Sequence, residues 1–87
     1  MRVKNALQLM RDIRRDCDRL GWTPIETKYS LEKGFAVVAV RDKTDGKFST
    51  HVFMPMHGLL SGQYAFTEEG ARTSVIQRFD DMKGALS

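Results

Sequence analysis

Among the residues of this 87-residue chain whose side chains suit catalysis or metal binding are Cys17, His51, His57 and Ser61. His57 and Ser61 lie four residues apart, and a histidine beside a serine can act as the general base for that nucleophile. However, they belong to a glycine-flanked segment without the strand–turn–helix context of a nucleophile elbow, and no third group can be assigned to orient the histidine. We therefore expect that the protein is not an enzyme.

The spacing of these side chains does not favour a metal site either. Zinc ligands usually occur as cysteine or histidine pairs a few residues apart, and Cys17, His51 and His57 contain no such pair. Met54 and Met56, close to His57, would suit a soft metal ion, but methionines in an apolar segment more often pack against other side chains. We expect no metal and no small-molecule cofactor.

The charge of the protein is concentrated in its first twenty residues. They contain six basic and three acidic residues, an excess that equals the net charge of +3 of the whole chain. Arginines four residues apart lie above one another on a helix, so the pattern predicts a basic ridge able to contact phosphates. Aspartates three residues before Arg15 and Arg19 can pair with them and weaken that ridge. The candidate nucleic-acid-binding residues are Lys4, Arg11, Arg15 and Arg19.

The same segment is expected to form an amphipathic helix, because its apolar residues recur at spacings of three and four. Asn5 is expected to cap its start, with Gln8 reciprocating. Gly21 should end it in the left-handed conformation, which costs glycine little. The predicted buried stripe consists of Val3, Ala6, Met10, Ile13, Cys17 and Leu20.

The rest of the chain predicts an antiparallel sheet and a second helix. Residues 25–31, 35–40 and 47–54 are the expected strands, with a loop at 55–63 and a short fourth strand at 64–66. Thr67 is the expected N-cap of the second helix, whose predicted buried stripe is Ala71, Val75, Phe79, Met82 and Leu86. The fold class is therefore a single α+β domain over residues 1–87, ordered helix, three-stranded antiparallel sheet, helix.

Composition places the chain among globular proteins, with 41% apolar and 29% charged residues. The longest apolar run is six residues, at 35–40, whereas a membrane-spanning helix needs about twenty. A single cysteine, Cys17, excludes an internal disulfide and favours a reducing compartment, so we expect a cytoplasmic location.

The strand at 35–40 is apolar on both of its faces, although an exposed antiparallel sheet is normally polar on one. Three arrangements would bury the second face: the two helices could lie on opposite sides of the sheet, the apolar loop at 55–63 could fold back over it, or a partner chain could pack there. Loops often carry binding residues, and a contiguous exposed apolar area marks an interaction site. The candidate partner-binding residues are Val38, Val40, Met56, Leu59 and Leu60.

We therefore expect a non-enzymatic protein-interaction module, such as a small regulator, adaptor or inhibitor that acts by occluding a surface. Its partner would be another protein or a second copy of itself in a homodimer. The alternative is a DNA- or RNA-binding protein that uses the basic face of the N-terminal helix.

Overall fold

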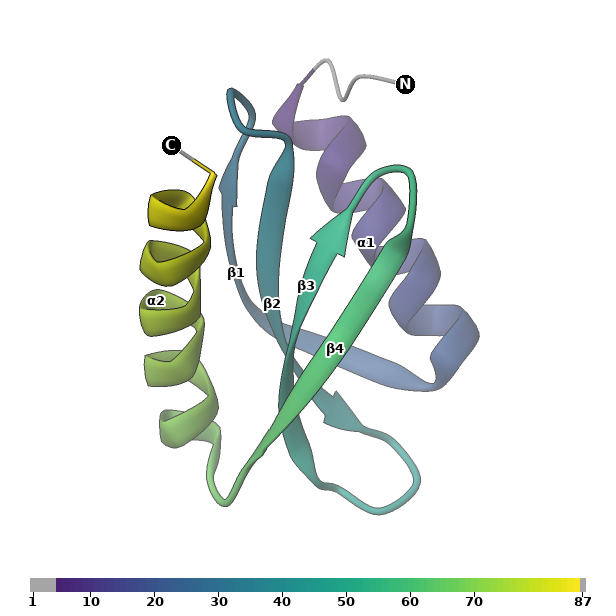
Figure 1. Ribbon diagram of the computed structural model, residues 1–87. Helices are drawn as coiled ribbons and strands as arrows, with labels where there is room; N and C mark the ends of the chain where they lie inside the picture. The colour runs from purple at the N-terminus through teal and green to yellow at the C-terminus, as the bar shows by residue number, and fades with distance from the viewer. Residues whose placement is uncertain (1–4, 87) are drawn as a thin grey trace.

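The computed structural model describes residues 5–86, apart from the side chain of Ser61. The chain begins with helix α1 (Ala6–Leu20) and ends with helix α2 (Glu68–Ala85). Between them lie four strands in chain order (Figure 1): β1 (Trp22–Ser30), β2 (Phe35–Asp42), β3 (Phe48–Met54) and β4 (Gly58–Ala65). The predicted α+β order is confirmed, and the fourth strand is present.

The helix ends follow the local hydrogen-bonding rules that the sequence indicated. The Asn5 side chain accepts a hydrogen bond from the backbone N–H of Gln8, and Gly21 closes α1 at a φ of 76°. Thr67 caps α2 in the same way as Asn5 caps α1, accepting from the backbone N–H of Gly70 at 2.9 Å. All three predicted caps are therefore confirmed.

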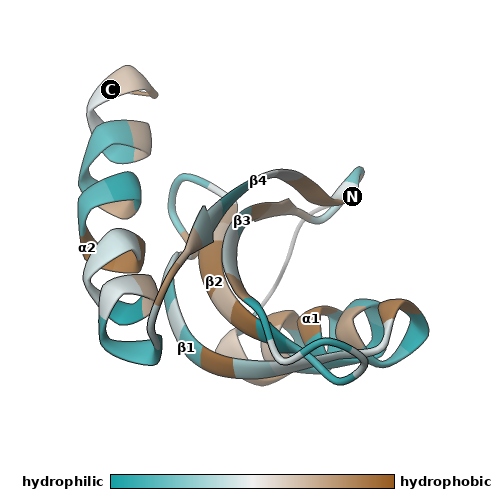
Figure 2. Ribbon diagram, turned by 90° about the horizontal axis from the view of Figure 1, so that it is seen from below, coloured by the Kyte–Doolittle hydropathy of each residue, from teal (hydrophilic) through white to brown (hydrophobic). Residues whose placement is uncertain are grey.

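Each strand pairs antiparallel with the strand that follows it, in the order β1-β2-β3-β4. The sheet is curved, with α1 on its concave side and α2 on its convex side (Figure 2). The two central strands are thus covered by a helix on either face, whereas β1 and β4 form the edges of the sheet.

β2 is buried on both faces because each helix covers one of them. Leu9, Ile13 and Cys17 of α1 pack on one face of β2, which presents Ala36, Val38 and Val40. The other face of β2, with Phe35, Val37 and Ala39, packs against Ala71, Val75 and Phe79 of α2. Of the three arrangements considered for the second face, the structure shows the first, helices on opposite sides of the sheet.

This arrangement corrects the assignment of Val38 and Val40 to a docking surface. Both side chains are fully buried beneath α1, so neither can contact a partner. Leu59 also turns inward and packs against the α1 cluster as a partly buried residue. The inward direction of these three residues leaves only Met56 and Leu60 of the predicted set exposed.

The segment expected to be a loop at 55–63 is mostly strand. A short turn at residues 55–57 follows β3, closed by a hydrogen bond from the His57 N–H to the Met54 carbonyl at 2.9 Å. β4 then starts at Gly58 and runs to Ala65, well before the predicted start at residue 64. A bulge between the partners of His51 and Phe53 breaks the alternation that would have revealed this strand.

The buried stripe of α1 is rotated from the predicted one. Leu9 replaces Met10 in the core, while Met10 and Leu20 each remain 40% exposed. Leu9, Ile13 and Cys17 form one row four residues apart, which fits the sheet better than the mixed spacing of the expected stripe. Val3, also in that expectation, lies outside the described residues. In α2, Ala71, Val75 and Phe79 are buried as predicted, whereas Leu86 is 41% exposed.

The turn before β4 depends on Gly58. Its φ of +75° is unfavourable for any residue with a side chain, and a Cβ there would lie 2.6 Å from the Asp16 carboxylate of α1. We expect Gly58→Ala to lower the free energy of unfolding by about 1–3 kcal/mol, as measured by urea denaturation. Gly84→Ala in α2, where a Cβ meets nothing within 4 Å, is the matched control and should raise it by about 0.5 kcal/mol. Equal effects of the two substitutions would contradict the role assigned to the turn.

Candidate functional site

β4 is the edge of the sheet with an unusual surface. Among the described residues it pairs only with β3, so one row of its backbone N–H and C=O groups faces away from the sheet. Large apolar side chains of this strand and its flanks are also exposed. We call the free backbone of Gly58–Ala65 together with these side chains the β4 edge; they are Met56 (68% exposed), Leu60 (37%), Tyr64 (84%) and Phe66 (105%).

The β4 edge carries no formal charge. From residue 55 to residue 67 the sequence contains no Asp, Glu, Lys or Arg. Natural proteins usually protect an edge strand from unwanted pairing with charged side chains, proline or a bulge. Apart from the bulge between Leu59 and Gly62, β4 has none of these protections, so its backbone is open to another strand.

The opposite edge, β1, is protected by all three devices. Pro24 removes a backbone donor, a bulge interrupts the pairing between Pro24 and Glu26, and Glu26 and Lys28 add charge. Glu26 is moreover held by α2, since the Arg72 guanidinium donates to it with 2.6 Å between Nη1 and Oε1. The two edges of one sheet therefore differ sharply in their readiness to accept a strand.

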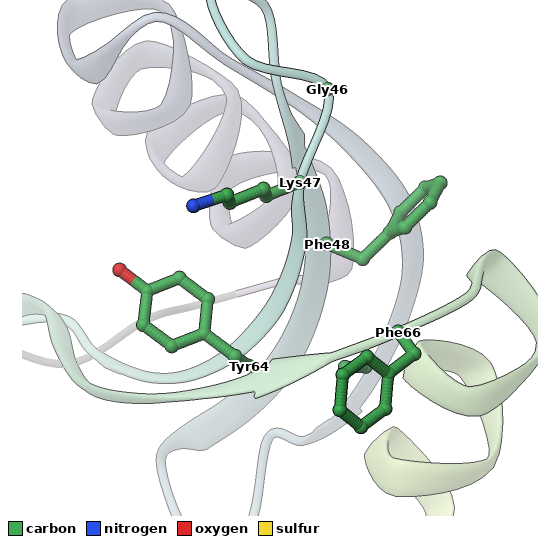
Figure 3. Close-up of a pocket in the computed structure, with 6 residues that line it drawn as sticks. Gly46, Lys47, Phe48, Tyr64 and Phe66 are labelled. Carbon is green, nitrogen blue, oxygen red and sulfur yellow. The ribbon is translucent and has the colours of Figure 1, made fainter.

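At its C-terminal end the β4 edge continues into a shallow hollow of about 380 Å³, lined by Gly46, Lys47, Phe48, Tyr64, Ala65 and Phe66. Lys47 and Tyr64 extend to the same side of the two strands, and Phe48 extends to the opposite side (Figure 3). Aromatic rings thus lie on both sides of the strands at the end of β4, and the Lys47 ammonium group lies on the side of Tyr64. Such clusters of rigid aromatic side chains are typical of the anchors of protein interfaces.

The side chain of His51, on β3, contacts the backbone of β4. Its ring stacks on Trp22 with 4.3 Å between the ring centroids, and its Nδ1 lies 3.1 Å from the Leu60 carbonyl oxygen. Gly62, the cross-strand partner of His51, leaves room for the ring, because a Cβ at position 62 would overlap it. Burial of the ring lowers the pKa of His51 below its usual 6.5. We conclude that neutral His51 holds β4 in place.

Ser49 and His51 form a contact that resembles a nucleophile and its base. The Ser49 Oγ lies 2.9 Å from the His51 Nε2, and the other ring nitrogen is oriented by the Leu60 carbonyl. With Nδ1–H donating to that carbonyl, Nε2 accepts the hydroxyl proton of Ser49 in a hydrogen bond. Each ring nitrogen then has a hydrogen-bond partner. Packing and hydrogen bonding are therefore sufficient to explain why Ser49 and His51 lie in contact.

The other residues considered for chemistry lie on three different segments: α1, the turn before β4, and β4. Cys17 is buried between α1 and the sheet, where burial and then the neighbouring Asp16 and Asp18 raise the pKa of its thiol to about 11. His57 lies in the exposed turn before β4, and the Ser61 side chain is outside the described residues. Within residues 5–86 there is no group of three or more His, Cys, Asp or Glu side chains suited to a metal ion.

The predicted basic ridge of α1 is exposed but partly neutralised. Arg11, Arg15 and Arg19 all face solvent, while Lys4 lies outside the described residues. Arg15 pairs with Asp12 at 2.9 Å, and Arg19 approaches Asp16 at 3.9 Å. These two pairs line a groove of about 470 Å³ between α1 and the turn before β4, together with Gln8, Phe53, Pro55, His57 and Gly58. The ridge is therefore a mixed-charge surface.

Of the predicted partner-binding residues, Met56 and Leu60 are exposed, and Tyr64 and Phe66, which were not in that set, are exposed as well. The sequence held one signal for Tyr64 and Phe66, the thirteen-residue stretch 55–67 without a formal charge. Exposure of the two rings could not be deduced from the pattern, because aromatic residues in strands are usually half-buried.

Comparison with protein-family models, with curated proteins and with solved structures found no match to this chain. In the part of the chain that the structure describes, neither helix has the length and apolar character needed to cross a membrane.

The lowered pKa of His51 predicts how stability depends on pH. The unfolded chain binds a proton at this residue near pH 6.5 and the folded protein only at lower pH. The free energy of unfolding should therefore decrease as the pH falls from 7 through 6.5 and towards the lowered pKa. Urea denaturation between pH 7.5 and 5 measures this decrease, and His51→Gln should flatten it. His57→Gln is the matched control and should leave it in place; a decrease unchanged by His51→Gln would contradict the assignment.

Proposed function

We propose that this protein is a non-enzymatic protein-interaction module that binds its partner through the β4 edge. The single observation that carries the proposal is an edge strand without charge or proline along its whole length, with Met56, Leu60, Tyr64 and Phe66 exposed on it or beside it. Docking on this edge would cover a surface of the partner, as expected of a small regulator, adaptor or inhibitor.

The physical basis is strand addition. An extended segment placed beside β4 would satisfy the outward row of backbone N–H and C=O groups. Affinity from these main-chain hydrogen bonds would be largely independent of the partner's sequence, whereas contacts with Leu60, Tyr64 and Phe66 would select among partners. Because the edge is uncharged, binding should be insensitive to salt, unlike binding to a phosphate backbone.

Site-specific photo-crosslinking in an extract of cells that produce the protein tests this proposal. A benzophenone side chain at position 64, on the β4 edge, should give discrete protein adducts, identified by mass spectrometry. The same probe at position 76 is the control, since Ile76 is 54% exposed on α2. Adding Leu60→Lys to the position-64 probe should reduce adduct yield about tenfold, the effect of losing roughly 1.4 kcal/mol of binding energy.

Equal adduct yields from positions 64 and 76, or adducts at position 64 that survive Leu60→Lys unchanged, would exclude the β4 edge as the binding site. Circular dichroism of each variant shows that the fold is intact.

Nucleic-acid binding by α1 is a second candidate function, supported by the exposure of Arg11, Arg15 and Arg19 on one helix. The pairing of Arg15 and Arg19 with aspartates ranks it below the first candidate, because each pair reduces the positive field that phosphates would meet.

Mobility-shift titrations with duplex DNA, duplex RNA and single strands at two salt concentrations test this candidate. Three phosphate contacts predict a log–log salt slope of about −3 for duplex DNA, lost on replacing the three arginines by glutamine. A control with the same loss of charge elsewhere replaces Lys28, Lys43 and Lys83 by glutamine and should keep most of the slope. If both triple variants reduce the salt slope equally, α1 is not the specific nucleic-acid-binding surface.

A further inference from the structure

We infer that the partner on the β4 edge is a second copy of this chain, paired β4 to β4 in antiparallel orientation across a twofold axis. The two four-stranded sheets would then form one continuous sheet of eight strands. This inference rests on the proposed function, because it names the occupant of the same edge.

The first support is the self-complementarity of an antiparallel edge. Two identical strands related by a twofold axis present donors opposite acceptors over a regular stretch, so the same surface serves both partners. A twofold axis at Gln63, in the regular stretch after the bulge between Leu59 and Gly62, would place Tyr64 of each copy opposite Gly62 of the other. The exposed Tyr64 ring would then lie over a residue without a side chain, and Leu60 of each copy would lie at the end of the paired stretch, near Phe66 of the other.

The second support is the distribution of charge. Each copy carries a net charge of +3, so two copies repel each other at most orientations. The segment 55–67 has no formal charge, and the arginines of α1 belong to a different layer of the molecule. The β4 edge is therefore a surface where two copies can approach while bringing few like charges together, with Lys47 beside its C-terminal end. The β1 edge cannot serve in the same way, since Glu26 and Lys28 lie along it and Pro24 lacks a donor.

The length of the paired stretch determines the expected affinity between the two copies. The stretch from Leu60 to Phe66 spans about 20 Å, and pairing of the strands with their exposed side chains gives an interface near the small end of the specific range. Such interfaces are weak and exchange quickly, so we expect dissociation in the micromolar range. The protein should therefore change from monomer to dimer over an accessible range of concentration.

Sedimentation velocity and light scattering over a range of about 1 to 500 μM test this inference on the full chain. The wild type should pass from monomer to dimer, and Tyr64→Lys or Leu60→Lys should shift the midpoint at least about tenfold upwards. Ile76→Lys adds the same charge to an exposed apolar position of α2 and should leave the midpoint unchanged. Far-UV circular dichroism confirms that each variant is folded.

A second measurement locates the contact without altering the apolar side chains. Gln63→Cys places a thiol near the middle of β4, and a short bismaleimide should join two copies through it. Native Cys17 does not compete, because it is fully buried and its thiol has a raised pKa. Gln77→Cys, on the exposed side of α2, is the control and should give little crosslinked dimer.

The outcomes separate this inference from the function on which it rests. A chain that stays monomeric over the whole range, or a dimer indifferent to Tyr64→Lys and to Leu60→Lys, overturns pairing with a second copy. If the position-64 photo-probe still forms adducts with other proteins, the proposed function stands and its partner is a different chain. If neither dimer nor edge-dependent adducts are found, both proposals fail.

Discussion

The burial of β2 between two helices determines most of this structure. Ala36, Val38 and Val40 need cover on one face and Phe35, Val37 and Ala39 on the other, and all six are fully buried. Burying a valine side chain contributes roughly 1.5–3 kcal/mol relative to exposure, so neither face can be left in water without a large loss of stability. α1 and α2 must therefore lie on opposite sides of the sheet. β1 and β4 remain as the two edges of the sheet.

β4 shows the effect of this constraint most clearly. It is two strands away from β2, and neither helix covers Leu60 or Tyr64 completely. β4 is held by its backbone pairing with β3, by the packing of Leu59 on the α1 cluster, and by the contact of His51 with the Leu60 carbonyl, for which Gly62 leaves room. A strand held mainly from one side can keep its other side free for a partner. The proposed function follows from this division between the covered centre and the uncovered edge.

The sequence predicted features that depend on neighbours in the chain and missed those that depend on distant packing. Asn5, Gly21 and Thr67 are correct as caps because a cap is made by hydrogen bonds within one turn. β4 was underestimated because Gly58, Gly62 and the bulge opposite His51 interrupt the alternation of apolar and polar residues. Leu9 and Met10 are both apolar neighbours on α1, and only the sheet beneath decides which of them is buried. The choice among a helix, a loop and a partner as cover for Val38 and Val40 likewise requires the arrangement in space.

The simple order of the strands has a consequence for the kinetics of folding. Every strand pairs with its immediate successor, so the whole sheet assembles from three local hairpins joined by short turns. Contacts between residues far apart in the sequence are made by the helices. An example is the contact between Arg72 and Glu26, which are 46 residues apart. Topologies dominated by local contacts fold faster than those that pair distant strands, and mixed two-state domains of this size fold in roughly milliseconds. We therefore expect the hairpins to form early and the docking of α2 to complete the native state, so that β4 is in place before its edge meets another chain.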